Sequence, residues 1–383
     1  MSRIDPINSP ESSKPLKIAI IGSRGYPYVY SGYETFVKEI AERLVLRGVE
    51  VHVYCHKNLF QSYPPVIKGI MLHYIPTIEK KSLSQLVHST LCMLHTLGKG
   101  YDALLVVNAA NGPLGIIPRL TGTRTLINVD GMEWLRPKWK GLGSKYFYFA
   151  ARMATKLYDL IITDADAMRA VYLKEFNKDS KVIAYGAPDI SRQSFELNPA
   201  WGLQSGDYYL IVGRLIPDNN ADLIIDGFLA ANSSKKLVVV GDVPYQDEWA
   251  EKLKSISHPN LLFLGYVTHA AELMALYQHC FVYLHGHEFG GTNPTMLKAM
   301  ASQCAILALN TSFNREMLQD GSFGLFFDKL PAAVARQMTR LEQQPEHVKE
   351  LRNKVSKGLT EKYNWDAITE SYLDAIKSLT HKY

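Results

Sequence analysis

Cysteines are few in this sequence, and long hydrophobic runs are lacking. The 383 residues include four cysteines, Cys55, Cys92, Cys280 and Cys304, and none has a CxxC spacing. Such scattered thiols argue against a disulfide framework or a zinc site and fit a reducing compartment. No apolar stretch reaches the roughly 20 residues that a membrane-spanning helix needs. We therefore expect a cytoplasmic protein without a transmembrane segment.

Strong charge of one sign is also lacking. The formal net charge is +5, which is too small to indicate a nucleic acid partner but suits anionic small ligands or an acidic membrane surface. Residues 1–16 are polar and contain prolines, so they predict a disordered tail rather than a signal peptide.

Buried-strand patterns alternate with helical patterns along the rest of the chain. KIAIIGS (17–23) predicts a strand, YETFVKEIAERLVLRG (33–48) a helix, and IKGIMLHYIP (67–76) one further strand. Strands that alternate with helices predict a parallel sheet with helices on both faces.

This pattern occurs twice, separated by a segment rich in turn-forming residues. We expect an α/β protein with a Rossmann-like N-terminal domain over 17–190, a linker over 191–206 and a Rossmann-like C-terminal domain over 207–360. The amphipathic segment 361–383 predicts a helix that packs back on the first domain. Ligands of open parallel sheets bind beyond the carboxyl ends of the strands, so the cleft between the two doubly wound sheets is the expected site.

The segment HEFGGTNPTML (287–297) combines glycines with a helix-start signal. Gly290 and Gly291 let the backbone approach a ligand, Thr292 or Asn293 can cap the helix, and Pro294 suits its first position. Free N–H groups at such a helix start would bind an anion. A plain strand–turn–helix connection is the alternative interpretation.

Arg214 follows another predicted strand, in VGRLIPDNN (212–220). A guanidinium at a strand end can bind phosphate through two hydrogen bonds. Considered alone, such an arginine is more often a partner in a surface ion pair.

The loop IGSRGYPYVYSGYETF (21–36) connects a predicted strand to a helix without a Walker A or GxGxxG spacing. Arg24, Gly25, Gly32 and Glu34 lie in it, and they are candidates for an acceptor-side or phosphate-binding loop. A long connection with turn glycines is the alternative.

The segment NVDGMEWLRPKW (128–139) ends a further strand with two carboxylates. Asp130 and Glu133 could both reach the cleft, where one would orient or deprotonate a hydroxyl group.

Two features resemble parts of metal sites, but the sequence does not support a metal site. Asp164 and Asp166 in TDADAM begin a predicted helix, where aspartate is an ordinary cap. His285 and His287 lack metal-like partners in sequence, so we interpret them as core residues or residues behind the site. We predict no metal.

The segment KWKGLGSKYFYFAARMATK (138–156) combines lysines with aromatic residues in a helical pattern. Such a helix could rest on an anionic bilayer, at the inner face of the cell membrane. A solvated basic face is the alternative.

Taken together, these motifs resemble those of retaining GT-B glycosyltransferases, and more narrowly a bacterial rhamnosyltransferase-type group. The resemblance rests on GSRG-YP-YSGYETFV and NVDGMEW in the first half. In the second half it rests on VGRLIPDNN, HGHEFGGTNPTMLKAMA and NTSFNREML, and it covers nearly the whole chain after residue 17.

The resemblance implies a GT-B fold and transfer of a sugar from a nucleotide diphosphate sugar to a hydroxyl of a polysaccharide or lipid-linked glycan. Deoxythymidine-diphosphate rhamnose is the usual donor in this group, and no further cofactor is expected. The implied catalytic residues are Asp130, Glu133 and Glu288. The implied donor-binding residues are Arg214, Gly265, Tyr266, Gly290, Gly291, Thr292, Asn293, Thr295 and Lys298.

Two positions depart from the family pattern. Asn219 stands where a lysine is common, and Lys298 stands where the broader family has a glutamate that accepts from ribose hydroxyls. A lysine ammonium only donates hydrogen bonds. Two other functions therefore stay open: a non-catalytic scaffold that binds nucleotide sugars in a glycan assembly complex, and a nucleotide-sugar epimerase of the same fold.

Overall fold

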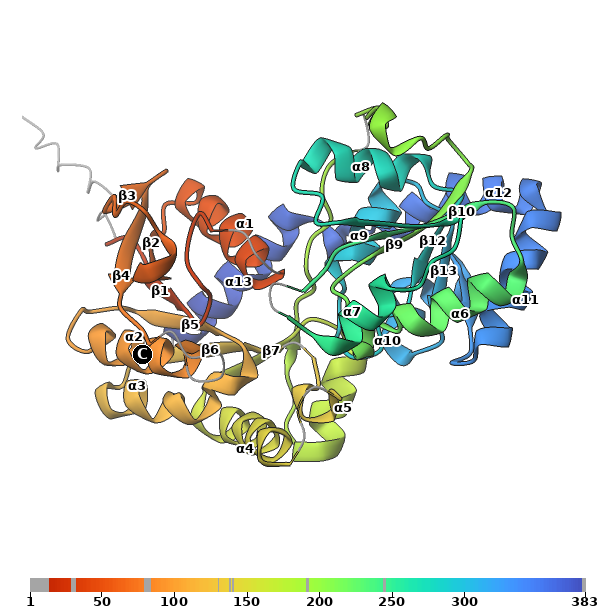
Figure 1. Cartoon of the computed structure of the whole chain (residues 1–383). Helices are drawn as coiled ribbons and strands as arrows, with labels where there is room; N and C mark the ends of the chain where they lie inside the picture. Colours follow the sequence, from red (N-terminus) through yellow and green to blue (C-terminus); the bar gives the residue numbers. More distant parts are fainter. Residues whose placement is uncertain are drawn as a thin grey trace, which may run out of the picture.

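Two parallel sheets form the framework of the protein, one in each of two lobes (Figure 1). The computed structural model describes residues 14–28, 32–78, 84–129, 131–137, 139, 141–190, 193–243 and 246–380. Most of the predicted N-terminal tail therefore lies outside the described residues. The predicted α/β architecture with two doubly wound sheets is confirmed.

The first lobe contains an eight-stranded sheet in the order β3-β4-β2-β1-β5-β6-β7-β8. Its strands are β1 (Lys17–Ile21), β2 (Glu50–His56), β3 (Val66–Ile67), β4 (Ile70–Ile75), β5 (Ala103–Val107), β6 (Arg124–Val129), β7 (Leu160–Thr163) and β8 (Lys181–Val182). Its longer helices are α1 (Gly32–Leu46), α2 (Ser84–Thr96), α3 (Ile116–Thr121), α4 (Leu142–Leu157) and α5 (Asp166–Phe176).

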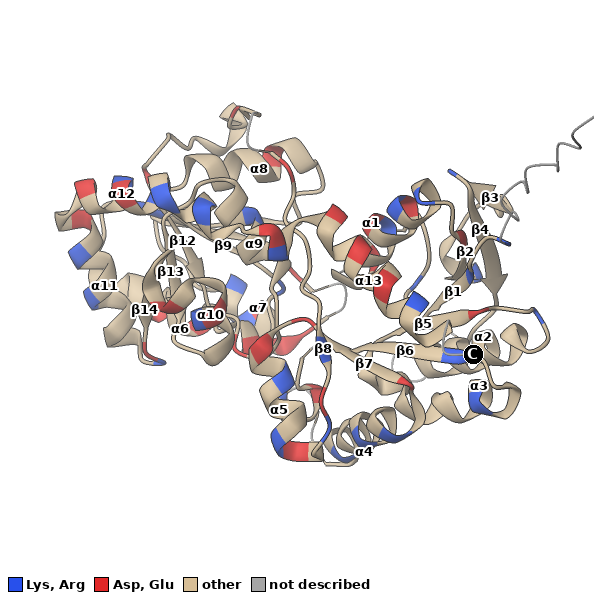
Figure 2. Cartoon of the chain, turned by 180° about the vertical axis from the view of Figure 1, so that it is seen from behind, with Lys and Arg blue, Asp and Glu red and all other residues tan. Residues whose placement is uncertain are grey.

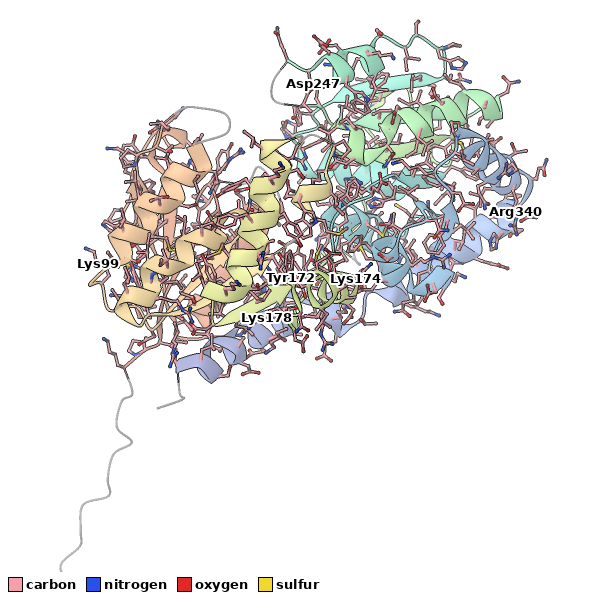
Figure 3. All side chains as sticks on the ribbon, turned by 90° about the horizontal axis from the view of Figure 1, so that it is seen from below. Lys99, Tyr172, Lys174, Lys178, Asp247 and Arg340 are labelled. Carbon is pink, nitrogen blue, oxygen red and sulfur yellow. The ribbon has the colours of Figure 1, made fainter. Side chains whose placement is uncertain are left out.

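Alternate residues of β1 enter different hydrophobic clusters. Ile18 and Ile20 pack with α1, whereas Ala19 and Ile21 pack with α2, α4 and α5. This follows from the period of two in a strand and from right-handed crossovers, which put α1 on one face of the sheet and α2 to α5 on the other. Figure 3 shows α4 lying across this second face, seen from below.

The second lobe contains a six-stranded sheet in the order β11-β10-β9-β12-β13-β14. Its strands are β9 (Tyr208–Val212), β10 (Lys236–Val240), β11 (Leu261–Gly265), β12 (Val282–His285), β13 (Ile306–Leu309) and β14 (Leu325–Phe327). Its helices are α6 (Ala221–Ala231), α7 (Glu248–Lys254), α8 (Ala270–His279), α9 (Pro294–Ala301), α10 (Ser312–Met317), α11 (Pro331–Gln343) and α12 (Pro345–Val355).

The last helix, α13 (Trp365–Thr380), returns to the first lobe. It contacts α1, β5 and β6 there, as Figure 2 shows from behind. Trp365 covers Gly186, where an added Cβ would lie only 2.4 Å from the indole ring. Only a glycine at position 186 therefore lets the helix dock this closely.

One predicted strand differs from the structure. Residues 67–76 do not form a single strand, because Lys68 and Gly69 adopt positive φ angles of 49° and 79°. The turn they make pairs β3 antiparallel with β4, so an antiparallel edge ends a sheet that is otherwise parallel.

Several buried histidines lie under the first sheet. The rings of His56 and His88 lie against each other with centroids 3.6 Å apart and a tilt of 34°. Burial lowers the pKa of His56 to about 3, with the neighbouring His88 and Arg24 adding to the effect, and burial lowers the pKa of His88 to about 4. Both rings are therefore neutral in the folded protein at neutral pH.

We predict that the protein loses stability in mild acid. The unfolded chain binds protons near pH 6.5, whereas these folded histidines resist protonation, so stability is complete above about pH 6.5 and falls as pH drops toward 4. For His88 the loss is about 1–2 kcal/mol at pH 5. Urea unfolding between pH 5 and 7.5 measures this loss. His88→Leu should reduce the change in unfolding free energy between pH 7.5 and 5, whereas the exposed control His269→Ala should leave that change as it is. If both variants show the same pH dependence as the unchanged protein, His88 is not the cause.

Candidate functional site

The starts of two helices meet between the lobes. Gly32 begins α1 in the first lobe, and Pro294 begins α9 in the second. A Cβ built on Gly32 would touch Cγ of Pro294 at 3.4 Å. Because both helices follow carboxyl ends of parallel strands, this junction is where an open α/β protein binds ligands.

Asn293 is the residue that caps α9. Its Oδ1 accepts from the Thr295 N–H at 2.9 Å and from the Thr295 hydroxyl at 2.7 Å, and Pro294 occupies the first helical position. Of the two capping residues that the sequence allowed, the structure therefore uses Asn293.

Thr292 is instead bound to the other lobe. Its N–H donates to Oδ2 of Asp164 at 2.9 Å, and its hydroxyl donates to the Asp164 carbonyl. A Cβ on Gly291 would lie 1.8 Å from Oδ1 of the same buried carboxylate, so only glycine fits there. Asp164 is thus held between β7 and the turn before α9.

This contact corrects two expectations. Asp164 does not cap its own helix, because α5 starts at Asp166 and its N-cap residue Ala165 makes no side-chain cap. The Thr292 amide is not free for a ligand anion in this arrangement, because a carboxylate of the protein already accepts from it. The sequence could not reveal this pairing, since the partners are 128 residues apart.

Gly290 and Gly291 keep the anion-binding character of the turn. Within the described part of the chain their amides have no acceptor. Gly290 has a φ of 140°, and a Cβ built on it would meet nothing within 4 Å. Gly290 is therefore the open donor position of the turn, whereas Gly291 is buried beside the Asp164 carboxylate.

A second contact between the lobes caps α5. Both carboxylate oxygens of Glu316, on α10, accept from backbone amides: Oε1 from Asp166 at 2.9 Å and Oε2 from Ala167 at 2.8 Å. Lys362 lies 2.7 Å from Glu316 and 2.9 Å from Asp166. Each lobe thus places a carboxylate on amides of the other lobe.

Arg136 makes a third contact between the lobes, although no sequence pattern pointed to it. Its guanidinium contacts Glu133 at 2.7 Å within its own lobe and buried Asp218 at 3.1 Å in the other. It also donates to the Phe289 carbonyl at 3.4 Å, just before the glycine turn. Arg136 lies within the quoted segment 128–139, but only its position in space reveals this role.

Arg214 lies near the same place from the second lobe. Burial, together with the positive charges of Arg214 and Arg136, lowers the pKa of His287 to about 3. Arg214 is exposed, and the described residues provide no carboxylate partner for it. An exposed cation therefore lies beside His287, close to the glycine turn.

The two candidate acids that the structure describes are both engaged in ion pairs. Glu133 binds Arg136 and accepts from the Trp139 indole at 2.8 Å. Glu288 lies 2.6 Å from Lys329. Asp130 lies outside the described residues, so its position is not part of this geometry.

In the described part of the loop after β1, Arg24 and Gly25 contact Glu34 and Cys55. Glu34 is buried and accepts from the Arg24 N–H at 3.0 Å. Gly25 packs against Cys55, whose Cβ would lie 2.7 Å from a Cβ on the glycine. Glu34 therefore shapes the loop, and Gly32 is the candidate in this loop that touches the other lobe.

The remaining donor-side candidates lie at several places. Tyr266 is 53% exposed and follows Gly265 at the end of β11. The side-chain amide of Asn219 donates to the Arg214 carbonyl at 2.8 Å, so it braces the loop that holds the arginine. Lys298 is half-buried on α9, and burial lowers the pKa of its amine.

His285 and His287 stack with centroids 4.5 Å apart, and His285 bonds the Tyr283 hydroxyl at 3.0 Å. This arrangement agrees with their interpretation as residues behind the site. Among the residues described, no group of three or more His, Cys, Asp or Glu side chains could hold a metal ion.

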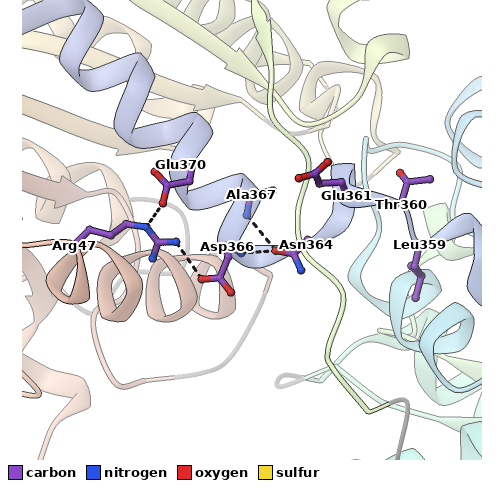
Figure 4. Close-up of a pocket in the computed structure, with 8 residues that line it drawn as sticks. All are labelled: Arg47, Leu359, Thr360, Glu361, Asn364, Asp366, Ala367 and Glu370. Carbon is purple, nitrogen blue, oxygen red and sulfur yellow. Dashed lines mark hydrogen bonds and ion pairs between the residues drawn. The ribbon is translucent and has the colours of Figure 1, made fainter.

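A surface hollow of about 490 Å³ lies elsewhere, where α13 begins (Figure 4). Its arginine, Arg47, is paired with Glu370 and Asp366, which raise the pKa of the guanidinium. Since these carboxylates already neutralise Arg47, we interpret the hollow as the junction of α1 and α13 rather than as a ligand site.

Two families match parts of this chain. Residues 206–344 match the family described as glycosyl transferases group 1, and residues 116–188 match a domain of unknown function (DUF1972). A curated relative from Campylobacter jejuni, N-acetylgalactosamine-N,N'-diacetylbacillosaminyl-diphospho-undecaprenol 4-alpha-N-acetylgalactosaminyltransferase, is 27% identical over 279 residues, or 70% of each chain.

Solved structures show the same fold over almost the whole length. Sucrose-phosphate synthase from Thermosynechococcus elongatus has a TM-score of 0.78 and 15% identity, with 95% of this chain and 99% of that chain covered. The Anabaena protein HepE in complex with UDP-glucose has a TM-score of 0.73 and 15% identity, over 95% of this chain and 100% of that chain. The fold is GT-B, and together with the family match it supports a GT-B glycosyltransferase.

We predict that the Asp164 carboxylate stabilises the contact between the lobes. Asp164→Ala would leave the buried Thr292 amide without an acceptor, at a cost of about 1–3 kcal/mol in the free energy of unfolding. Urea denaturation measures this cost. Asp166→Ala is the matched control, because it removes an exposed ion pair worth under about 1 kcal/mol. Equal effects of the two changes would contradict a special role for Asp164.

Proposed function

We propose that the protein moves a sugar, rhamnose or another hexose, from a nucleotide diphosphate sugar to a hydroxyl group with retention of configuration. The acceptor is a polysaccharide or a lipid-linked glycan. The second lobe would hold the donor and the first lobe the acceptor.

One observation carries this proposal: anion-binding groups gather at the junction of the lobes. Arg214 has no carboxylate partner among the described residues, and the nearby turn offers the amides of Gly290 and Gly291. A guanidinium and backbone N–H groups at strand ends suit a diphosphate. Arg136 is less available, because Glu133 and Asp218 already bind it.

The chemistry follows from this set of donors. Negative charge develops on the diphosphate as the glycosidic bond breaks, and fixed dipoles with Arg214 would stabilise it without a metal. No described side chain stands out as a nucleophile. We therefore favour a front-face reaction in which the departing phosphate helps to accept the proton of the acceptor hydroxyl, and Asp130 orients that hydroxyl.

The similar proteins support the two substrate classes separately. The name of the Campylobacter jejuni relative describes transfer to a diphospho-undecaprenol-linked sugar. HepE was crystallised with UDP and with UDP-glucose. Rhamnose as the sugar rests on the resemblance of the motifs alone.

A non-catalytic scaffold is the second candidate, because Lys298 and Asn219 change two donor-side positions. Asn219 braces the Arg214 loop instead of adding a charge, and Lys298 brings an amine where an acceptor oxygen is expected. Calorimetry with nucleotide diphosphate sugars, followed by mass spectrometry with lipid extract of the native host as acceptor, separates the candidates. Nucleotide release with a glycosylated product supports the transferase, binding alone supports the scaffold, and isomerised donor without acceptor supports the epimerase.

We predict that Arg214→Ala weakens nucleotide diphosphate binding by about 1.5–3 kcal/mol, because one charged hydrogen-bond donor is lost. Titration calorimetry measures the change in Kd. Arg340→Ala, at the far end of the second lobe in Figure 3, should have no effect. Unchanged affinity in the Arg214 variant would remove the phosphate-binding role.

We predict that Asp130→Asn lowers kcat much more than it weakens donor binding. The amide keeps the size of the side chain but lacks the negative charge that would hold and orient the acceptor hydroxyl. Steady-state turnover combined with donor titration checks this split. Turnover at the level of the unchanged protein would exclude Asp130.

A further inference from the structure

Three neighbouring helices, α2, α3 and α4, carry an exposed hydrophobic surface. They cover one face of the first sheet, and we call their outward side the α2–α4 face. Arg119 on α3 donates to the Lys156 carbonyl on α4 at 3.1 Å, and α2 contacts α3, so the three helices form one continuous surface. Seven of the 17 exposed large hydrophobic side chains among the described residues lie on these three helices.

On α4 the exposed residues follow the helical period. Leu142, Lys145, Phe149, Arg152 and Lys156 all point outward, with the apolar residues toward the start of the helix. Leu142 is 84% exposed and Phe149 is 51% exposed. A helix that presents leucine and phenylalanine beside lysine and arginine is typical of one that lies in a membrane interface.

The neighbouring helices extend this hydrophobic surface. Leu91 and Leu94 are exposed on α2, and Ile116 and Leu120 on α3, where Leu120 is 83% exposed. Isolated exposed leucines are ordinary, but a contiguous set marks an interaction site.

The charges of these helices favour a membrane over another partner. The sequences of α2, α3 and α4 contain no aspartate or glutamate, whereas α3 and α4 contain Arg119, Lys145, Arg152 and Lys156 (Figure 2). The opposite face of the same sheet is covered by α1 and α13, and α13 contains Asp366, Glu370 and Asp374. The helices of the α2–α4 face therefore carry cations without carboxylates, whereas α1 and α13 carry carboxylates together with Lys38, Arg43 and Lys377.

A groove lies on the α2–α4 face, between the start of α4 and the segment that follows Glu133. It encloses about 400 Å³ and is lined by Trp134, Leu135, Lys145, Tyr148, Phe149 and Arg152, among others. Trp134 and Leu135 follow Glu133 directly in a short 3-10 helix. Glu133 in turn binds Arg136, which reaches the second lobe.

We propose that the α2–α4 face docks on an anionic phospholipid bilayer. Its apolar side chains enter the headgroup region while Arg119, Lys145 and Arg152 contact lipid phosphates. In this orientation the groove beside Glu133 opens at the bilayer, where a lipid-linked acceptor is anchored. That docking brings the protein close to its acceptor rests on the proposed function, whereas the docking itself does not.

Vesicle binding tests the docking without donor or acceptor. The full chain is sedimented with vesicles of phosphatidylcholine alone and of equal parts phosphatidylcholine and phosphatidylglycerol. We expect binding to the anionic vesicles that weakens with added salt, and much weaker binding to phosphatidylcholine. Lys145→Gln should lower the partition coefficient about fivefold, the effect of one charge near the membrane surface.

Leu142→Glu is the decisive variant, and Leu46→Glu is its matched control. Both leucines are 84% exposed, but Leu46 ends α1 on the opposite face. Leu142→Glu should lower the partition coefficient at least about tenfold, because it removes an inserted apolar side chain and adds a repelled charge. Leu46→Glu should change nothing. Thermal unfolding of both variants verifies that the fold is intact.

Three results would overturn the docking: no binding of the unchanged protein to anionic vesicles, equal binding of the two leucine variants, or a dimer in solution that Leu142→Glu converts to a monomer. The last result would assign the face to a second copy of the chain. Turnover with a short water-soluble acceptor should be the same in Leu142→Glu as in the unchanged protein. If that turnover is absent in both while vesicle binding holds, only the proposed function fails.

Discussion

The site depends on two hydrogen-bonded contacts in which each lobe binds backbone amides of the other lobe through a carboxylate. Asp164 accepts from the Thr292 amide of the second lobe, and Glu316 accepts from the first two amides of α5 in the first lobe. Both contacts place an anion on backbone N–H groups at or before a helix start, where the helix dipole favours negative charge. They hold the glycine turn, Arg214 and the Arg136 network at one junction.

This arrangement also determines how much of the turn remains for a ligand. A protein carboxylate occupies the Thr292 amide, so the amides of Gly290 and Gly291 and the guanidinium of Arg214 are left as donors. The two halves of the protein thus present different groups. The second lobe gathers the groups suited to a diphosphate, and the first lobe combines a candidate acceptor loop with a cationic, apolar outer face.

The sequence was most informative where the physical signal was local. The alternation of strand and helix patterns predicted both sheets, because buried residues recur with one period in a strand and with another in a helix. A cap at Thr292 or Asn293 followed by Pro294 predicted the start of α9, because capping depends on neighbouring residues. Short or polar elements such as β14 and α12 were not recognised, since their positions depend on packing against distant residues.

The sequence by itself therefore determined the α/β fold, the glycine turn and the positions of Arg214 and Gly32. Only the tertiary structure decided that Asp164 fills part of that turn, that Arg136 bridges Glu133 and Asp218, and that three helices share one outward face. These contacts join residues far apart in the chain, and their geometry exists only after the two lobes have packed together. Periodicity and capping act over a few residues, whereas a pairing between lobes leaves no local pattern.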